Sequence, residues 1–330
     1  MEVPLTTPAP AVSVVIPLYN KERHVARAIQ SVLDQVFRDF ELIVVNDGST
    51  DGSVEAVKTF TDARIRLVHR EHVNSGGGHA ARNLGIAEAR ADLIAFLDAD
   101  DEWLPGHLET IKRLSEKYPG CGAFATAYAV VAPDGKRWVH ASDGIPAHPW
   151  EGIIPSYFRS APTYPVVTIS VAIPRRVFDS VGLFPVGVSQ GGDTDTWCRI
   201  ALEYPVCYST QVGAVYHKEA DNRVCLLNRP LGEFGRAKAI RDALRTGRVP
   251  VEHRRDAFEF MAFSQIRVAG RNISAGYPRQ ARRLLQSCRG TRRYARVWWL
   301  LMLQTMLPPG WPTRFKAARK ATLNVVVRRG

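Results

Sequence analysis

Apolar and polar positions in the first 120 residues follow two alternating patterns. Short continuous apolar runs, each ending in a polar turn, predict buried strands at 11–17, 40–45 and 93–97. Residues 64–69 alternate between apolar and polar positions, which predicts a further strand. Between the first two runs, apolar residues recur every three or four positions from Val25 to Val36, which indicates one face of a helix. Further helices are predicted near 54–60, 79–89 and 108–118. Strands that alternate with helices favour a mostly parallel central sheet and an α/β fold.

The pattern changes after residue 120. Apolar segments on both sides of Pro133-Asp134-Gly135 predict a β-hairpin. A strand at 166–173, a short helix at 175–181, a helix from 191 to 203 and a late strand at 205–216 follow. From about Leu231 the spacing is helical to the end of the chain, which predicts a C-terminal helical extension.

Charge separates this extension from the rest. Residues 1–222 hold 20 Lys and Arg against 27 Asp and Glu, a net charge of −7, whereas 223–330 hold 24 against 5, a net charge of +19. Such a segment either solvates its own surface or binds a negatively charged partner, nucleic acid or an anionic membrane. The apolar run 297–303, with two tryptophans, fits an interfacial membrane helix or a buried core helix.

Features of the whole chain predict its compartment. The first ten residues contain no apolar signal sequence, and no apolar run reaches the ~18 residues that span a bilayer. Five cysteines without a CxxC pair argue against a disulfide framework. We therefore expect a cytoplasmic protein, either free or attached peripherally to the cytoplasmic face of a membrane.

Three carboxylates follow the strand at 93–97. Parallel sheets bind ligands at the carboxyl ends of their strands, so Asp98 and Asp100 are expected at a ligand-binding rim. Two carboxylates one residue apart can approach one hard divalent cation such as Mg²⁺ or Mn²⁺. The alternative is that Asp100 or Asp101 only caps the helix beginning near Pro105.

Four segments, in this order, resemble the family 2 glycosyltransferases, which are inverting nucleotide-sugar enzymes of the GT-A fold. They are Val12–Asn20, Glu41–Asp51, Asn74–Asn83 and Phe96–Asp101. Each segment alone is common, but each here follows a predicted strand or opens a predicted helix. The resemblance covers about residues 12–217.

The resemblance implies a nucleotide-sugar site. Its expected donor-binding residues are Pro17, Tyr19, Asn20, Glu22, Asp47, Gly77, Gly78, Arg82 and Asp98. Asp47 would accept a hydrogen bond from a base N–H, which favours UDP- or dTDP-sugars, although an Asx-turn is its alternative role. Arg82 would face the diphosphate or be a solvated helix residue. Asp100 and Asp98 would hold Mg²⁺ or Mn²⁺, with His217 as a possible third metal ligand.

A second acidic element opens the helix at 191–203. Gly192-Asp193 resembles the family's Glu-Asp element, whose Asp is the general base, although Gly192 departs from the usual Glu. An inverting transfer needs one base to take the proton of the attacking hydroxyl. We expect Asp193 in this role, with Asp195 as the alternative; both could instead be acids of a helix first turn.

The resemblance also implies the domain plan and the function. The GT-A catalytic domain would span 1–225, with a nucleotide-sugar half at about 11–120 and an acceptor half at about 121–225, and the basic extension would span 226–330. The protein would be a metal-dependent inverting glycosyltransferase acting on an acceptor hydroxyl of a glycan or lipid-linked acceptor, in cell-envelope polysaccharide or glycolipid synthesis. The alternative is a non-catalytic sugar-nucleotide or nucleic-acid binding protein on the same fold. Nucleic acid is the weaker partner, because the aromatics of 226–330 fall within apolar helix stripes.

Overall fold

The computed structural model describes residues 8–70, 78–188, 190–219 and 232–306 of the chain. The strands are β1 Val12–Leu18, β2 Phe40–Asn46, β3 Ile65–His69, β4 Leu93–Phe96, β5 Glu102–Trp103, β6 Ala123–Val131, β7 Arg137–Val139, β8 Glu151–Ile153, β9 Val171–Pro174 and β10 Val206–His217. The helices are α1 Val25–Leu33, α2 Ser53–Lys58, α3 His79–Glu88, α4 His107–Lys117, α5 Tyr157–Ser160, α6 Arg175–Val181, α7 Gly192–Glu203, α8 Gly235–Arg245, α9 Arg254–Ser274, α10 Pro278–Ser287 and α11 Ala295–Gln304.

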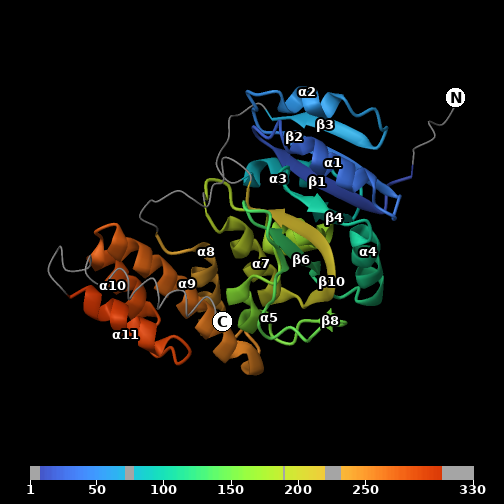
Figure 1. Cartoon of the computed structure of the whole chain (residues 1–330). Helices are drawn as coiled ribbons and strands as arrows, with labels where there is room; N and C mark the ends of the chain where they lie inside the picture. The colour runs from blue at the N-terminus through green and yellow to red at the C-terminus, as the bar shows by residue number, and fades with distance from the viewer. Residues whose placement is uncertain (1–7, 71–77, 189, 220–231, 307–330) are drawn as a thin grey trace.

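The strands of the described residues join in one mixed sheet. Its main path runs β3-β2-β1-β4-β9-β6-β10-β5, with β7 beside β6 and β8 beside β10. The first four strands on this path pair in parallel. Strand β9 is antiparallel to both β4 and β6, so it joins the parallel half to the second half, where β6 and β10 are again parallel. The expected mostly parallel sheet with flanking helices is confirmed, and Figure 1 shows the extension α8–α11 on the side away from β2 and β3.

The predicted elements of the parallel half form where the apolar pattern placed them. All seven residues of β2 are buried, as expected for a strand covered on both faces. Helix α1 buries Val25, Ala28, Ile29 and Val32 against the sheet. Val36, which the sequence pattern includes in this stripe, is 58% exposed because the helix ends at Leu33.

The second half differs more from the expectation. Of the strand expected at 166–173, only Val171–Ile173 is extended, because Thr168–Ser170 forms a 3-10 turn before β9. The hairpin at Pro133-Asp134-Gly135 is present, with β6 and β7 antiparallel. Strands β5 and β8 are only two and three residues long, too short to leave a periodic pattern in the sequence.

The extension shares its apolar core with the sheet. A single hydrophobic cluster includes Phe96 of β4, Trp197 of α7, Phe260 of α9 and Leu301 of α11. The expected domain boundary near 225 lies outside the described residues, so the division into two domains stays a prediction. Among the described helices, none combines the length and the apolar character that crossing a bilayer requires.

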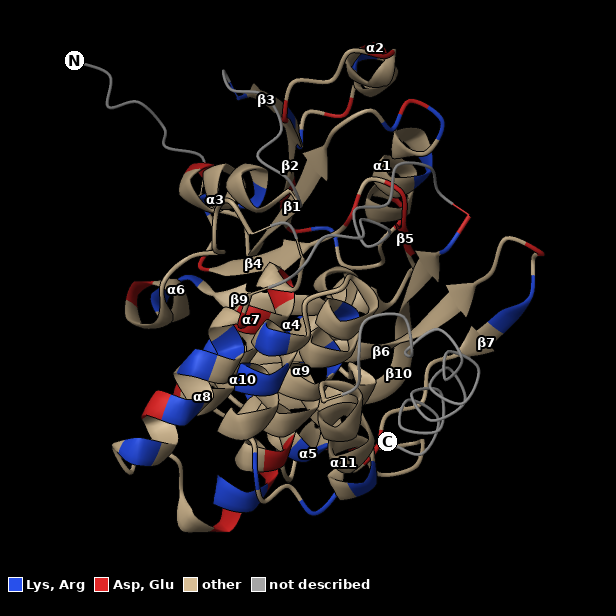
Figure 2. Cartoon of the chain, turned by 90° about the vertical axis from the view of Figure 1, so that its left-hand side faces the viewer, with Lys and Arg blue, Asp and Glu red and all other residues tan. Residues whose placement is uncertain are grey.

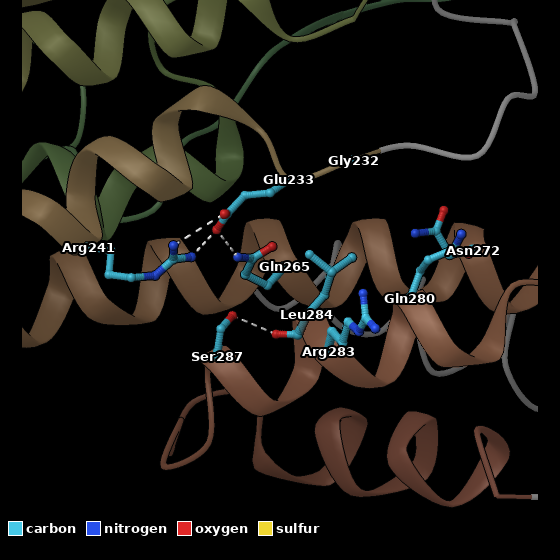
Figure 3. Close-up of a pocket in the computed structure, with 9 residues that line it drawn as sticks. All are labelled: Gly232, Glu233, Arg241, Gln265, Asn272, Gln280, Arg283, Leu284 and Ser287. Carbon is cyan, nitrogen blue, oxygen red and sulfur yellow. Dashed lines mark hydrogen bonds and ion pairs between the residues drawn. The ribbon is translucent and has the colours of Figure 1, made fainter.

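A hollow of about 600 Å³ lies within the extension (Figure 3). Polar side chains of α8, α9 and α10 line most of it, and Glu233 at its edge is paired with Arg241 and Gln265. None of the predicted site residues lines this hollow.

Candidate active site

The carboxyl ends of β1, β2 and β4 bring three predicted loops to one edge of the sheet. These strands are parallel neighbours, so the loops that follow Leu18, Asn46 and Phe96 emerge side by side. Three of the four resemblance segments therefore meet at one rim. The remaining segment, Asn74–Asn83, includes Gly77, which lies outside the described residues. It also includes Gly78, which has φ +68 and precedes α3.

The first two loops are fastened to each other by Asn20 and Glu22. Asn20 has φ 49, and its Oδ1 accepts a hydrogen bond from the Thr50 N–H at 2.8 Å. Glu22 Oε2 accepts from the Gly52 N–H at 3.2 Å. Both side chains thus hold the loop after β1 against the loop after β2. Pro17 and Tyr19 are half-buried at the same rim.

Asp47 is buried and paired with a cation that the sequence analysis missed. Its Oδ1 accepts a hydrogen bond from Arg70 Nε at 2.5 Å, and Arg70 follows the last residue of β3. Because β2 and β3 are parallel neighbours, their ends bring the two residues together. The carboxylate is therefore more than the Asx-turn former of the alternative interpretation.

The acidic turn after β4 is held by two basic side chains. Asp98 Oδ1 accepts from Arg82 Nη2 at 2.5 Å, and Asp100 Oδ2 pairs with Lys21 Nζ at 2.8 Å. Arg82 is only 6% exposed, so it is a buried partner of the turn and not a solvated helix residue. Burial raises the pKa of Asp98, and the positive charge of Arg82 opposes this rise.

Asp101 is the most buried carboxylate of the turn. Its Oδ1 accepts from the His217 backbone N–H at 2.7 Å, and its Oδ2 has no hydrogen-bond partner among the described residues. Burial raises the pKa of Asp101 well above its usual range, and the charges of Asp100 and Asp98 raise it further. The negative charges of Asp98 and Asp100, which raise this pKa, are charges that a cation at the turn would offset.

The donor atoms of the turn fit a divalent metal of the Mg²⁺ type. Asp98 and Asp100 supply hard oxygen ligands, and Mg²⁺ is commonly held by one or two carboxylates together with substrate phosphates. Within the described ranges, no group of three His, Cys, Asp or Glu residues has a metal-binding arrangement, and the two-carboxylate site stays a prediction. The ring nitrogens of His217 lie 2.5 Å from Glu219 and 3.2 Å from Glu102, so its ligand role stays a prediction.

Helix α7 presents its two first-turn acids differently. Asp195 is 5% exposed, and its Oδ1 accepts from Arg236 Nη1 at 3.0 Å. Burial raises the pKa of Asp195, and Arg236 opposes the rise. Asp193 is half-buried, and its one described hydrogen bond is a long one, 3.4 Å from Thr194 Oγ1. The geometry therefore leaves Asp193 as the more available base.

Arg236 comes from α8, outside the region of family resemblance. It is 5% exposed and also donates from Nε to Ser264 Oγ of α9 at 3.0 Å. No sequence signal separates this arginine from its many neighbours in the basic extension, because its partner Asp195 lies 41 positions away.

His79, at the first position of α3, explains the glycine at 192. A Cβ at position 192 would overlap His79 Nε2, so a larger residue there would displace the ring. The ring stacks on Phe184, with centroids 5.9 Å apart, and is 4% exposed. Burial, helped by Arg82, lowers the pKa of His79 to about 4, and the charge of Asp193 opposes this. Both residues belong to segments that the sequence analysis named, but their contact could not be predicted from the sequence.

Asp193 also acts on the acidic turn. Its negative charge helps to raise the pKa of Asp98, as it does that of His79. The two acidic elements predicted separately are joined by α3, whose His79 packs against Gly192 and whose Arg82 pairs with Asp98.

Comparison with known proteins shows which family and which fold this chain resembles. Residues 13–171 match the model of glycosyl transferase family 2. One Escherichia coli relative is named UDP-Glc:alpha-D-GlcNAc-diphosphoundecaprenol beta-1,3-glucosyltransferase WfgD. It is 40% identical over 98 residues, which are 30% of this chain and 38% of that protein. The chain spans between 18% and 57% of the length of the first curated relatives it matches.

Two solved structures share the fold. TarS 1-349 of S. aureus, in complex with UDP-GlcNAc, aligns with a TM-score of 0.60 over 89% of this chain and 81% of its own, at 15% identity. The mannosyltransferase PcManGT of Pyrobaculum calidifontis, in complex with GDP-Man and Mn²⁺, aligns with a TM-score of 0.55 over 98% of this chain and 87% of its own, at 20% identity. The architecture described above is thus the expected GT-A fold.

Proposed function

The chain belongs to glycosyl transferase family 2 through residues 13–171, and on this premise we propose that it is a metal-dependent inverting glycosyltransferase. The observation that carries the proposal is the link through α3 between the acidic turn after β4, paired with Arg82, and the start of α7, where His79 packs against Gly192 beside the half-buried Asp193. A protein that only binds a sugar nucleotide needs the first element and has no use for a base beside it.

The donor would bind along the rim formed by the loops after β1, β2 and β4. Its base would lie near Tyr19 and Asp47, and a carboxylate acceptor favours the N–H of uracil or thymine over a ring nitrogen without a proton. The name of the relative WfgD includes UDP-Glc as donor, which supports this preference. Arg82 and Lys21, which pair with Asp98 and Asp100, would also contact the donor diphosphate.

The transfer step would be a single displacement. Asp193 takes the proton of the acceptor hydroxyl as its oxygen bonds to the anomeric carbon, and the anomeric C–O bond to the nucleoside diphosphate breaks. Asp98 and Asp100 would hold Mg²⁺ or Mn²⁺, which when bound offsets the negative charge on the departing diphosphate. His79 packs against Gly192 beside the base, and its lowered pKa of about 4 keeps the ring neutral near pH 7.

The acceptor would be a hydroxyl of a growing lipid-linked glycan or cell-envelope polysaccharide. Support comes from WfgD, whose name includes a diphosphoundecaprenol-linked sugar as acceptor.

A donor screen tests the proposal. The full chain is incubated with Mn²⁺ and a panel of UDP-, dTDP- and GDP-sugars, with and without a crude lipid-linked acceptor fraction, and released nucleoside diphosphate is measured. We expect acceptor-dependent release from a UDP- or dTDP-sugar. Saturable donor binding without release, under all these conditions, would instead indicate a binding protein.

A further inference from the structure

Helix α11 carries apolar side chains on two opposite faces. One face packs into the extension, where Val297 and Leu301 are buried and Trp298 Nε1 donates to the Leu285 carbonyl at 2.7 Å. The opposite face exposes large apolar side chains along the helix and the turn after it. These are Trp299, Leu300, Leu303 and Met306, which are 61%, 47%, 56% and 62% exposed.

The exposed residues form one continuous stripe. Arg296, Trp299, Leu300 and Leu303 are spaced i, i+3, i+4 and i+7, which places them on the same side of the helix. Single exposed apolar residues are ordinary on protein surfaces, whereas a contiguous group of this size marks an interaction site. In Figure 1, α11 lies at the edge of the extension, away from the strands of the nucleotide half.

The chain around this stripe is uniformly basic. Residues 260–330 contain fifteen Lys and Arg and not one Asp or Glu. Arg289 and Arg292 are exposed in the segment that leads into α11, and Arg296 is exposed in its first turn. Figure 2 shows further Lys and Arg on α8 and α10 of the same extension. The partner of the stripe should therefore combine an apolar interior with a negatively charged surface.

We propose that the exposed face of α11 docks the protein on an anionic lipid bilayer. The helix would lie in the plane of the interface, with Trp299, Leu300 and Leu303 entering the boundary between headgroups and acyl chains. The arginines before the helix would contact the anionic headgroups. Tryptophan in particular is enriched at this depth of a membrane.

Other occupants fit the stripe less well. A second copy of the chain would bring two surfaces of the same positive charge together. Nucleic acid would suit the arginines, but single strands are bound by aromatics interleaved with basic residues and not by a helical stripe of Leu, Trp and Met. Residues 307–330 carry six further Lys and Arg and no acid, so the segment that follows the stripe has the same sign of charge.

Vesicle flotation tests the docking without any donor or acceptor, so its result is independent of the proposed transfer activity. The full chain is mixed with phosphatidylcholine vesicles that contain or lack phosphatidylglycerol. We expect it to float with the anionic vesicles at low salt, to be released as salt screens the charges, and to ignore the neutral vesicles. The double variant Trp299→Glu with Leu303→Glu should lower the partition coefficient about tenfold or more.

The matched control is Val36→Glu with Val251→Glu. It adds the same two charges at exposed apolar positions elsewhere, 58% and 74% exposed, and should float like the wild type. Circular dichroism and urea unfolding check that both double variants remain folded. The proposal is overturned if the wild type stays out of the anionic vesicles at low salt, or if the α11 variant binds them as well as the control. It is also overturned if light scattering shows a dimer that the α11 variant abolishes.

Discussion

At the scale of single residues, the proposed transfer depends most on Asp193. Asp193→Asn keeps the shape of the side chain but removes the proton acceptor, so the transfer rate should fall ~10²–10⁴-fold. Donor affinity, measured by calorimetry, should survive because the carboxylate acts on the acceptor. The control Asp134→Asn, in the exposed β6–β7 turn, should leave both quantities unchanged. Loss of donor affinity in Asp193→Asn would assign Asp193 to the donor site.

Asp100 tests the metal at the same scale. Asp100→Ala removes one of the two adjacent carboxylates, and we expect it to abolish transfer while leaving the unfolding curve close to that of the wild type. Excess EDTA should have the same effect on the wild type, and added Mn²⁺ should reverse it. Full turnover in EDTA would show that the carboxylates of the turn serve without a metal.

His79 and Gly192 should behave as one unit. Gly192→Ala places a methyl group against the His79 ring and should destabilise the fold by about 1–3 kcal/mol, as overpacking does. His79→Ser makes room for that methyl group, so the double variant should recover much of the loss. Urea unfolding of the four proteins gives the coupling energy, and simple additivity of the two changes would contradict the contact.

At the scale of elements, Arg236 fastens α8 to the first turn of α7. Arg236→Met leaves Asp195 buried without its cation, which typically costs about 3–5 kcal/mol. The control Arg241→Met removes an exposed pair with Glu233 and should cost about 1 kcal/mol or less.

The loss in Arg236→Met should depend on pH. Burial already raises the pKa of Asp195, and removal of Arg236 raises it further. The deficit against the wild type should therefore be small below pH ~4, where Asp195 is protonated in both folded and unfolded chains, and grow as the pH rises above it. Urea unfolding at several pH values measures this, and a deficit that does not change with pH would show that packing alone is lost.

At the scale of the whole molecule, the continuous apolar core joins the extension to the sheet. We expect the full chain to unfold in one cooperative transition, with tryptophan fluorescence and far-ultraviolet circular dichroism giving the same midpoint. Two separate transitions would instead support independent domains that meet near residue 225.

The sequence predicted what local periodicity controls. Strands β1, β2 and β4 and helix α1 repeat their apolar positions within a few residues, so their place and burial could be derived. The meeting of the loops after β1, β2 and β4 could also be predicted, because neighbouring parallel strands end at the same edge of a sheet. No local pattern encodes contacts between residues far apart in the sequence. Asp47 and Arg70 are 23 positions apart, and Asp195 and Arg236 are 41 positions apart. The antiparallel direction of β9 likewise depends on its pairing with the distant strand β4.

The reach of Arg236 into α7 sets a condition on chimaeric enzymes. The C-terminal helices of this protein could be exchanged for those of a relative that has no arginine in the place of Arg236. This exchange would remove the cation opposite Asp195 and leave a buried charge two residues from the proposed base. A graft that is designed only around the matched region 13–171 would overlook this dependence, since both partners lie beyond it. Transplanted modules would have to carry position 195 and position 236 together, or replace both with an apolar pair.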